Sequence, residues 1–443
     1  MRILHYALGF PPYRTGGLTK FCMDIMKQQK VLGHEVALMW PGQMKLFDKS
    51  VQVMERKSQN GIRSFEVINP LPISYDEGIV EIEAFTKRCD KNSYVEILNK
   101  FKPDVIHVHT LMGLHKEFME SAKGQGIRTV FTVHDFFTIC PKVTMFREGK
   151  VCEYAVDCSM CPQCNLTALP MKKMFLLQSH IYRACKDSRI VRKLRKGHRD
   201  QYLSGESGQI AETQKSTRTK NDYQALRSYY RSIIDMFDMV HSNSSVTKEA
   251  FLKVYKPKDI KIIPISHADI RDNRRKKAFS TEKLRLTYLG PAGGAKGYFL
   301  LKEALDDLWN KDQSFILNVF FKSTDAPPYM VTHGRYDYSE LEGIFKDTDV
   351  LVVPSIWYET FGYTALEALS YGVPVIVSDH VGAKDVIPDG CGIVIKGMDK
   401  ERLVKCISSL NTEKLEAMNQ SIMEKAVIMT LIKMNDEIMK QCY

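Results

Sequence analysis

The sequence predicts an α/β protein with two doubly wound domains. Three observations support this fold class. Strands alternate with helices in both halves of the chain, a glycine-rich turn follows the first strand of each half, and a polar, basic stretch without periodicity separates the halves at residues 269–282. Such alternation is typical of parallel sheets covered by helices. A chain of 443 residues is long enough for two domains with separate cores.

The first domain is expected to span residues 1–270. An apolar strand ends at Pro11-Pro12, and Thr15-Gly16-Gly17 then opens a helical pattern that ends at Gly33. Ligands bind at the carboxyl edge of open α/β sheets, so this glycine turn is a candidate binding position. The strands expected in this half lie at residues 2–10, 35–40, 103–109, 128–134, 236–243 and 260–264. A cysteine-rich and mainly helical insertion, with a polar break at 204–219, is expected at about residues 140–230.

The second domain is expected to span residues 283–421, where the alternation of strands and helices restarts. A glycine-rich loop at 290–297 follows its first strand. Its strands are expected at residues 284–289, 315–321, 350–354 and 373–378, and its helices at residues 298–308 and 364–370. The amphipathic tail at 422–443 is predicted to be a C-terminal helix that could pack back on the first domain.

Composition narrows the class of protein. Apolar residues make up 44% and charged residues 26% of the chain, as in soluble globular proteins. No apolar run approaches the roughly 18–20 residues that span a bilayer. The N-terminus has the pattern of a first strand rather than of a signal peptide. The expected location is therefore the cytosol.

The net charge of +11 is unevenly distributed. Residues 172–199 contain ten Lys or Arg and one acid, Asp187. Such a stretch either favours an anionic partner, for example a membrane surface or a polyphosphate, or forms a solvated helix face. Aromatic residues are sparse in it and no nucleic-acid-binding fold is recognisable, so no nucleic-acid partner is expected.

The most informative segment is residues 350–378, where an apolar strand ends at Val353 and a helix starts near Gly362. The backbone amides of residues 361–363 then lie free at a helix N-terminus and can bind an anion. Glu359 lies in the loop, and Glu367 lies about one and a half turns into the helix; a carboxylate can accept paired hydrogen bonds from vicinal hydroxyls. The alternative is that both glutamates only cap and solvate the helix. The surrounding strand, aromatic loop and glycine favour a binding site.

This segment resembles the E-x7-E signature of the retaining glycosyltransferases of family 4, and the resemblance extends over nearly the whole chain. It implies a GT-B fold, in which two Rossmann-like domains face a cleft, and transfer of a sugar from a nucleotide sugar. The other matching stretches are Gly16-Gly17 (N-terminal glycine loop), His107-Val108-His109 (first-domain strand), Thr132-Val133-His134-Asp135 (histidine-bearing turn) and Gly290–Gly297 (phosphate loop).

The resemblance also implies roles for individual residues. Glu359 would contact the donor sugar and Glu367 the ribose, and Lys296 with the amides after Glu359 would hold the diphosphate. His134 resembles the histidine that contacts the donor sugar, although a histidine at a strand end is in general more often structural. The implied catalytic residues are Glu359, His134 and Lys296, and the implied donor-binding residues are Gly16, Gly17, Gly293, Gly294, Thr360, Phe361, Gly362, Tyr363 and Glu367. His107 and His109 are interpreted as mainly structural.

One residue departs from the family pattern. The family carries an arginine directly after the glycine that corresponds to Gly290, and Pro291 stands there in this chain. Arginine is the better bidentate phosphate clamp, so Lys296 and the Gly293-Gly294 turn must carry more of the leaving-group charge unless an arginine from elsewhere substitutes. The candidates are Arg274, Arg275 and Arg335. The loss favours an alternative function, a non-catalytic GT-B subunit that stabilises another glycosyltransferase.

No unambiguous nucleophile is visible, so the favoured mechanism is attack on the same face from which the diphosphate departs, with retention of configuration. No Asp-x-Asp motif stands near either glycine loop, and no catalytic metal is expected. The donor is expected to be UDP- or GDP-linked. The acceptor is expected to be a saccharide or lipid-linked saccharide of cell-surface polysaccharide synthesis, reached by a cytoplasmic protein that is peripheral at the inner face of the plasma membrane.

Five of the eleven cysteines lie within residues 140–164. Thiolates at x2 spacing can converge on one tetrahedral ion, so Cys152, Cys158, Cys161 and Cys164 are a candidate structural zinc site. An iron–sulfur cluster and no metal at all are the alternatives, and the run lacks the x3-Cys-Pro continuation of the bacterial ferredoxin pattern. Cys140 follows His134 by six residues and is interpreted as a spare thiol near the cleft.

Overall fold

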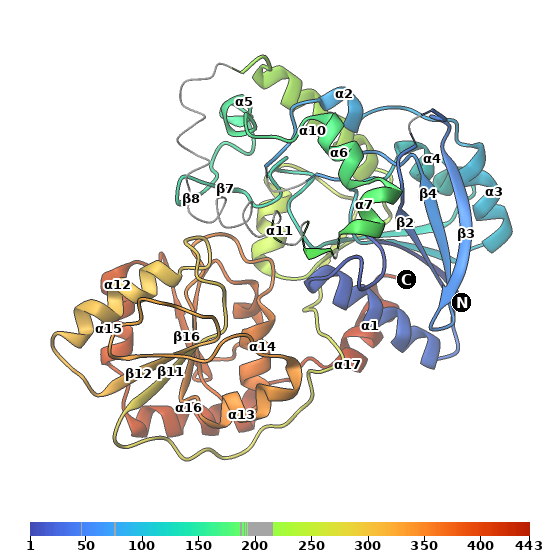
Figure 1. Cartoon of the computed structure of the whole chain (residues 1–443). Helices are drawn as coiled ribbons and strands as arrows, with labels where there is room; N and C mark the ends of the chain where they lie inside the picture. Colours follow the sequence, from blue (N-terminus) through green and yellow to red (C-terminus); the bar gives the residue numbers. More distant parts are fainter. Residues whose placement is uncertain (46, 75–76, 187, 190, 192, 194–215) are drawn as a thin grey trace.

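The structure is a computed structural model that describes residues 1–45, 47–74, 77–186, 188–189, 191, 193 and 216–443. Two lobes, each built around its own sheet, lie side by side (Figure 1). The first sheet has eight strands in the order β10-β9-β6-β5-β1-β2-β4-β3, and the second has six in the order β13-β12-β11-β14-β15-β16. The predicted fold class, α/β with two doubly wound lobes, is confirmed.

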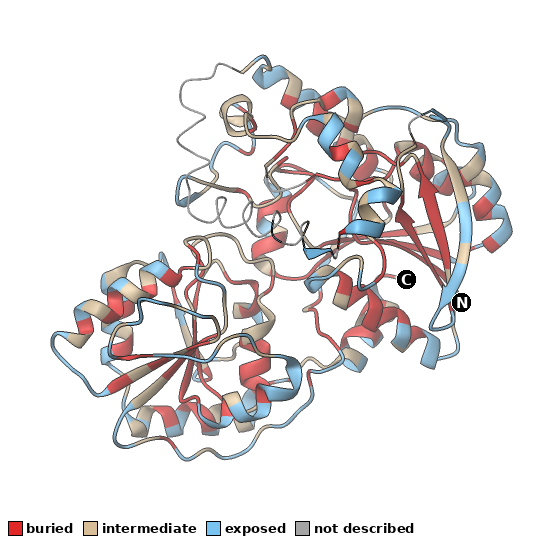
Figure 2. Ribbon diagram, viewed as in Figure 1, coloured by how far each residue is buried: buried red, intermediate tan, exposed pale blue. Residues whose placement is uncertain are grey.

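The strands of the first sheet pair in parallel except at β3–β4. They are β1 (Arg2–Tyr6), β2 (Glu35–Pro41), β3 (Gln52–Gln59), β4 (Ile62–Ile68), β5 (Val105–Val108), β6 (Arg128–Val133), β9 (Met239–Ser242) and β10 (Ile260–Ile262). Parallel strands covered by helices on both faces are buried on both faces, and Figure 2 shows the central strands of this sheet buried. The register sets His5 of β1 beside His107 of β5, and Thr132 of β6 beside His241 of β9.

The helices of this lobe cover the sheet and form the insertion. They are α1 (Gly17–Val31), α2 (Ile82–Phe85), α3 (Asn92–Phe101), α4 (Lys116–Gly124), α5 (Cys161–Cys164), α6 (Met171–Leu177), α7 (His180–Cys185), α10 (Lys220–Ile234) and α11 (Ser245–Leu252). A small hairpin of β7 (Phe146–Arg147) and β8 (Lys150–Val151) lies in the cysteine-rich segment. The polar break predicted at 204–219 lies outside the described residues as far as residue 215, and Thr219 caps α10 through a capping box with Asp222.

The second sheet is entirely parallel. Its strands are β11 (Leu284–Tyr288), β12 (Phe315–Val319), β13 (Met330–Thr332), β14 (Val350–Val353), β15 (Val375–Ser378) and β16 (Gly392–Ile395). Its helices are α12 (Tyr298–Trp309), α13 (Leu341–Lys346), α14 (Tyr363–Ser370), α15 (Lys400–Ser408) and α16 (Thr412–Lys425), with short 3-10 turns η1 (Tyr338–Glu340) and η2 (Gly382–Val386).

The tail differs from the single C-terminal helix that the sequence predicts. Residues 426–430 interrupt it, and a separate helix α17 (Leu431–Gln441) follows. The guanidinium of Arg274 donates to the carbonyls of Ile422 and Ala426, at 2.8 Å each. It thereby supplies hydrogen-bond donors to carbonyls at the C-terminal end of α16. The side chain of Thr430 then caps α17 by accepting from the amide of Lys433.

The chain ends inside the first lobe. Helix α17 lies against α1 (Figure 1), and the backbone carbonyl of Cys442 accepts from Arg128 Nε at 3.1 Å. One hydrophobic cluster contains buried residues of both lobes, among them Phe21, Phe361 and Ile438. The C-terminal helix therefore ties the second lobe to the first. Among the described residues, no helix is both long and apolar enough to cross a bilayer.

Candidate active site

The loop between β14 and α14 is held in place by a glycine that no other residue could replace without strain. Gly362 has φ of +90°, and a Cβ there would lie 2.9 Å from Val381 Cγ1 and 3.3 Å from Glu359 Cγ. It is the N-cap of α14, so the helix starts where the sequence predicts. The first amides of an α-helix have no acceptor within the helix and point outward, so this turn can bind an anion.

The glycine loop of residues 290–297 is hydrogen-bonded to this donor loop. The carbonyl of Ala295 accepts from the amides of Ile356 and Trp357 at 2.9 and 3.2 Å. Gly297 has φ of +75°, and a Cβ there would lie 1.8 Å from the carbonyl oxygen of Pro354. The two loops that resemble the phosphate loop and the E-x7-E signature thus form one wall of the site.

This contact brings Lys296 to Glu359. The ammonium of Lys296 pairs with Glu359 Oε2, and the indole N–H of Trp357 donates to the same oxygen at 3.2 Å. Lys296 Nζ also lies 5.1 Å from the centre of the Trp357 ring. The Glu359 side chain is 17% exposed and Lys296 is 31% exposed, so both remain accessible to a ligand. An anion could draw Lys296 away and leave the carboxylate free to accept hydroxyl hydrogen bonds.

The backbone of Glu359 is fixed on its other side by residues 380–382. Its amide donates to the carbonyl of His380 and its carbonyl accepts from the amide of Gly382, both at 3.0 Å. His380 Nδ1 in turn bonds the carbonyl of Ile356 at 2.6 Å. The carboxylate is therefore carried by a loop that is hydrogen-bonded at several points, which favours a fixed position of this side chain.

Glu367 is buried and has a partner that the sequence did not indicate. His267 Nε2 bonds Glu367 Oε1 at 2.9 Å, and the amide of Asp269 donates to His267 Nδ1 at 3.3 Å. Because Nδ1 accepts, Nε2 carries the proton and donates to the carboxylate. The ring of His267 lies 5.0 Å from the rings of Tyr338 and Tyr363. Of the two oxygens of Glu367, Oε2 is the one that His267 leaves to a ligand.

The first lobe contacts the donor loop, the start of α14 and the turn η2. A Cβ on Gly17 would lie 3.6 Å from the Tyr363 ring, so the predicted glycine turn faces the start of α14. The hydroxyl of Ser244, the N-cap of α11, donates to the carbonyl of Thr360 at 2.6 Å. Ser245 Oγ donates to Asp385 at 2.6 Å. Ser244 and Ser245 were missed in the sequence; the only signal is a serine pair directly after a buried strand.

His134 follows β6 directly, as predicted, and lies at the sheet edge. Its ring packs edge-on against Phe21, with centroids 4.7 Å apart, and its Nε2 is hydrogen-bonded to His109 Nδ1 at 3.3 Å. Burial lowers the pKa of His134 to about 3, so the ring is neutral at physiological pH. Two residues further on, Phe136 lies 6.1 Å from Tyr358, which precedes Glu359 in the donor loop. Within the described residues no hydrogen bond joins His134 to Glu359 or Lys296.

Three buried histidines approach the geometry of a metal site. Ring nitrogens of His5, His107 and His109 lie within 4.8 Å of one another. Each of their ring nitrogens already has a hydrogen-bond partner, however, among one another, Gln29, Thr132, His134 and Tyr443. The group is therefore satisfied without an ion and forms part of a polar core.

The arginines that could replace the missing phosphate clamp are not all available. Arg274 pairs with Asp272 at 2.7 Å and holds the end of α16, so it is committed to the fold. Arg275 pairs with Glu342 at 3.2 Å on the surface, and Arg335 is exposed. Pro291 accepts a hydrogen bond from Tyr288 through its carbonyl, at 2.9 Å. In the part of the chain that the structure describes, Lys296 is the cation paired with Glu359.

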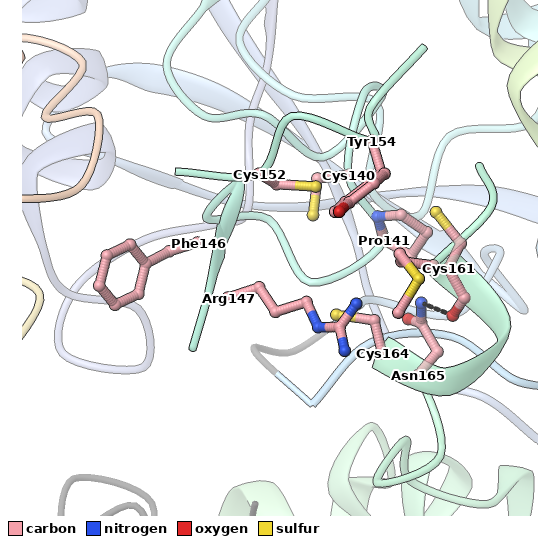
Figure 3. A pocket seen from close by; sticks show the side chains of 10 residues that line it. Cys140, Pro141, Phe146, Arg147, Cys152, Tyr154, Cys161, Cys164 and Asn165 are labelled. Carbon is pink, nitrogen blue, oxygen red and sulfur yellow. Dashed lines mark hydrogen bonds between the residues drawn. The ribbon is translucent and has the colours of Figure 1, made fainter. Parts of the chain in front are cut away.

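The zinc set predicted from the sequence, Cys152, Cys158, Cys161 and Cys164, stays a prediction, and the structure groups the cysteines of this segment as follows. Cys140, Cys152, Cys161 and Cys164 line one small cavity (Figure 3). Cys158 does not line it; this residue has φ of +61° and its sulfur accepts from Arg227 Nη1 at 2.7 Å. The pKa of Cys158 is lowered to about 7, first by a hydrogen bond from Cys161 and then by the charge of Arg227. The buried guanidinium of Arg227 needs polar partners, and Cys158 is one of them together with the carbonyls of Val156 and Ile139.

The basic stretch of residues 172–199 lies partly outside the described residues, including Arg192, Arg195, Lys196 and Arg199. Two of its cations act within the fold. Arg183 pairs with Glu66 at 3.1 Å and its guanidinium lies 4.5 Å from the Tyr13 ring. Lys186 donates to the carbonyl of Pro12 at 2.9 Å. These contacts hold the loop that leads to Gly16-Gly17.

Comparison with known proteins gives matches to two glycosyltransferase families. The family model described as Glycosyltransferase Family 4 matches residues 15–151, which include Gly16, Gly17 and His134. The model described as Glycosyl transferases group 1 matches residues 328–426, which include Glu359 and Glu367. The fold is similar to sucrose-phosphate synthase from Thermosynechococcus elongatus, with a TM-score of 0.56 and 14% identity over 99% of this chain and 97% of that one. This chain belongs to the GT-B glycosyltransferases.

Other solved structures share the fold of this glycosyltransferase. HepE of Anabaena in complex with UDP-glucose has a TM-score of 0.55 at 14% identity, covering 99% of this chain and 98% of that one. WaaG, titled as a glycosyltransferase involved in lipopolysaccharide biosynthesis, has a TM-score of 0.52 at 15% identity, covering 98% of this chain and 99% of that one. At such identities the likeness concerns the fold.

Curated relatives match over shorter segments. An uncharacterized 41.2 kDa protein in the cps region of Klebsiella pneumoniae is 32% identical over 135 residues, which are 29% of this chain and 37% of the relative. Sulfoquinovosyl transferase SQD2 of Arabidopsis thaliana is 30% identical over 155 residues, which are 33% of this chain and 29% of the relative. The chain spans about a third of the length of these relatives.

Proposed function

We propose that this glycosyltransferase moves a glycosyl group from a nucleoside-diphosphate sugar to a saccharide acceptor with retention of configuration. The observation that carries the proposal is the contact between Lys296 and Glu359 at the junction of two glycine-capped helices, α12 and α14. A cation, a carboxylate and outward-pointing amides are what a diphosphate-linked sugar requires in one place. Gly17 supplies the facing wall.

The donor binds by replacing one ion pair with two interactions. The diphosphate takes Lys296 and the first amides of α14, and Glu359 accepts hydrogen bonds from sugar hydroxyls. Glu367 Oε2 accepts from the ribose while His267 keeps Oε1. The sugar hydroxyls take the place of the ammonium as hydrogen-bond donors to Glu359, so the carboxylate is not left without a partner when the donor covers it.

In the reaction, the acceptor oxygen bonds to the anomeric carbon as the bond from that carbon to the phosphate oxygen breaks. The acceptor proton passes to the departing diphosphate on the same face. Lys296 and the α14 amides stabilise the negative charge that develops on the leaving group, and removal of one such donor typically costs about 10²–10³ in kcat. No protein nucleophile is required.

UDP- and GDP-linked sugars are the proposed donors, and UDP is favoured because HepE, a structural neighbour, is titled as a complex with UDP-glucose. The proposed acceptor is a saccharide or lipid-linked saccharide of cell-surface polysaccharide synthesis. The relative from a cps region and the neighbour named for lipopolysaccharide biosynthesis support this role. The protein would then be cytoplasmic and peripheral at the inner face of the plasma membrane. Failure to bind anionic liposomes at low salt would remove the membrane part of the proposal.

A thermal-shift screen against UDP-, GDP- and ADP-sugars tests the donor class. We expect stabilisation by one nucleotide and transfer activity that is lost in Glu359→Ala. The anomeric configuration of the product, read by NMR, tests retention. Activity that persists unchanged in Glu359→Ala would contradict the site assignment.

A non-catalytic partner subunit is the second candidate, and Pro291 favours it because the arginine expected after Gly290 is absent. Commitment of Arg274 to Asp272 and α16 adds to this observation. Such a subunit would show no transfer or donor hydrolysis with any nucleotide sugar but would raise the activity or stability of a second glycosyltransferase.

A further inference from the structure

Four cysteines of residues 140–164 line one small cavity in the insertion of the first lobe. Cys140 follows the His134 turn, Cys152 follows β8, and Cys161 and Cys164 begin and end α5. The cavity has a volume of about 20 Å³, which is room for about one water-sized sphere. In Figure 3 the cysteines lie around this hollow, with Arg147 and Tyr154 reaching into it.

We propose that Cys140, Cys152, Cys161 and Cys164 bind one zinc ion as thiolates. Four thiolates at about 2.3 Å from a tetrahedral ion form a closed structural site, and the x2 spacing of Cys161 and Cys164 suits it. In the described residues no three of the sulfurs lie within 4.8 Å of one another, so binding turns the side chains inward on the cavity. A four-thiolate zinc centre carries a charge of about −2. Arg147 in the cavity wall and Arg227 beside Cys158 lie where they compensate it.

Backbone conformation gives a second, independent observation. Seven described residues other than glycine have positive φ, and four of them lie between 143 and 158. Val143 is β-branched and has φ of +69°, a conformation that persists only when the surroundings impose it. The strands of the local hairpin are two residues each, so the backbone ladder alone offers little restraint. A metal cross-link would supply the missing restraint.

The zinc centre would affect catalysis by fixing the position of the turn that carries His134. The amide of Cys140 donates to the carbonyl of Phe136 at 2.7 Å, and Phe136 packs on Tyr358 of the donor loop at 6.1 Å. The ion would therefore fix the turn that carries His134 against the loop that carries Glu359.

Metal content of the purified full chain tests this inference. We expect one zinc per chain in the wild type, loss of zinc in Cys140→Ser and in Cys164→Ser, and retention in Cys158→Ser. The exposed Cys185→Ser is the matched control. Cobalt substitution of the wild type should give the ligand-field bands of a four-thiolate tetrahedral site, and this measurement does not depend on whether a variant folds.

Three results would overturn the inference: no metal in the wild type after reconstitution with zinc under reducing conditions, zinc kept in Cys140→Ser, or iron with acid-labile sulfide in place of zinc.

A separate observation concerns the polar core of the first sheet, and its functional part rests on the proposed function. Eight side chains form one continuous series of hydrogen bonds from the sheet interior to His134. In order they are His241, Thr132, His107, Tyr443, Gln29, His5, His109 and His134, and successive contacts measure 2.9, 2.6, 2.7, 3.1, 2.8, 2.9 and 3.3 Å. His241 Nε2 closes the series on the backbone carbonyl of Ile263 at 2.8 Å.

That carbonyl fixes the direction of every bond. A carbonyl can only accept, so His241 Nε2 donates, and a neutral His241 must then accept at Nδ1 from the Thr132 hydroxyl. The same reasoning passes along the series: His107 donates to Thr132, Tyr443 to His107, Gln29 to Tyr443 and His5 to Gln29. His109 then donates to His5 and His134 Nε2 to His109. Burial lowers the pKa of all five histidines, so each carries one proton.

We infer that this series locks His134 in the neutral Nε2–H tautomer, so that Nδ1 offers a lone pair to a hydroxyl of the donor sugar. Tyr443, the last residue of the chain, is a positioning residue for His134, because its hydroxyl both donates to His107 and accepts from Gln29.

Nitrogen NMR of histidine-labelled protein without any sugar nucleotide tests the tautomer apart from the proposed function. We expect pure Nε2–H shifts for all five histidines, with His134 assigned by its loss in His134→Gln. In Tyr443→Phe the His134 shifts should become those of a tautomer mixture, and kcat should fall more than KM changes. Tyr329→Phe, whose hydroxyl bonds Asp306 in the second lobe, is the control. A protonated or Nδ1–H His134 in the wild type, or unaltered His134 shifts in Tyr443→Phe, would overturn the inference.

Discussion

Lys296 and Glu359 pair with each other in the structure. In the proposed donor complex Lys296 would bind the diphosphate and Glu359 the sugar hydroxyls. Lys296→Ala should lower kcat/KM by about 10²–10³, because the cation that faces the leaving group is lost. The free energy of unfolding should change by only about 1 kcal/mol, since both side chains are partly open to solvent and such ion pairs are weak. Steady-state kinetics and urea unfolding check the two parts. Lys302→Ala, which breaks the surface pair with Asp306, is the control.

Alanine substitutions at two glycines of the 290–297 loop should differ in their effect on stability. Gly297→Ala should destabilise the protein and weaken donor binding, because its φ is +75° and a methyl group would meet the carbonyl of Pro354 at 1.8 Å. The cost of such a conformation alone is about 1–3 kcal/mol. At Gly294 the nearest atom to a Cβ lies 3.9 Å away, so Gly294→Ala should leave the melting temperature unchanged. Equal melting temperatures for both variants would contradict this account of the loop.

Individual site residues were predictable where a local pattern carried them. Glu359, Gly362 and Lys296 lie within short motifs, and the structure brings them into one wall. Ser244 and His267 could not be found this way. They are remote in sequence from the donor loop, and they reach Thr360 and Glu367 only after the two sheets have formed and the lobes have met.

At the scale of elements, α11 connects the lobes through its N-terminus. Ser244→Ala removes both the N-cap and the bond to the carbonyl of Thr360, so it should cost about 0.5–2 kcal/mol in stability and also raise the KM for the donor. Thr219→Ala removes the N-cap of α10, away from the donor loop, and should affect stability but not KM. Thermal unfolding and donor saturation curves measure both effects. An unchanged KM in Ser244→Ala would mean that α11 only supports the fold.

Elements with strong apolar periodicity were predictable, and those stabilised by tertiary contacts were not. The β3–β4 hairpin was missed because β3 is mostly polar, although Asn60-Gly61, both with positive φ, is a strong signal for a two-residue turn. The tail was predicted as one helix because its apolar pattern continues. The break at 426–430 depends on Arg274, which lies some 150 residues earlier in the chain. Its guanidinium donates to the carbonyls at the end of α16.

At the scale of the whole molecule, the C-terminus belongs to the core of the first lobe. Arg128 holds the carbonyl of Cys442, and the hydroxyl of Tyr443 reaches His107 between the central strands. The sequence indicated two sheets and a tail that could return, but not that the last residue completes the polar core. That core contains the five neutral histidines, so its stability must depend on pH.

Stability of the whole chain should fall steeply on mild acidification. The pKa values of His5 and His241 are lowered to about 4 and that of His134 to about 3, and those of His107 and His109 are also lowered, in each case mainly by burial. The unfolded chain takes up protons below about pH 6.5 and the folded chain does not, so stability is full above that pH and is lost as pH falls toward 4. Each proton that only the unfolded chain takes up lowers the free energy of unfolding by about 1.4 kcal/mol per pH unit.

Urea unfolding between pH 7.5 and 5 measures the number of protons from the slope of the unfolding free energy against pH. We expect uptake of more than two protons on unfolding near pH 5.5. His241→Gln should lower that number by about one, because it removes one buried imidazole that titrates only in the unfolded chain. Tyr329→Phe in the second lobe, which removes no imidazole, should not change it. A slope that stays near zero down to pH 5 would show that the histidines are charged in the folded protein at pH 5, and the hydrogen-bond series from Ile263 to His134 could not then have its derived direction at that pH.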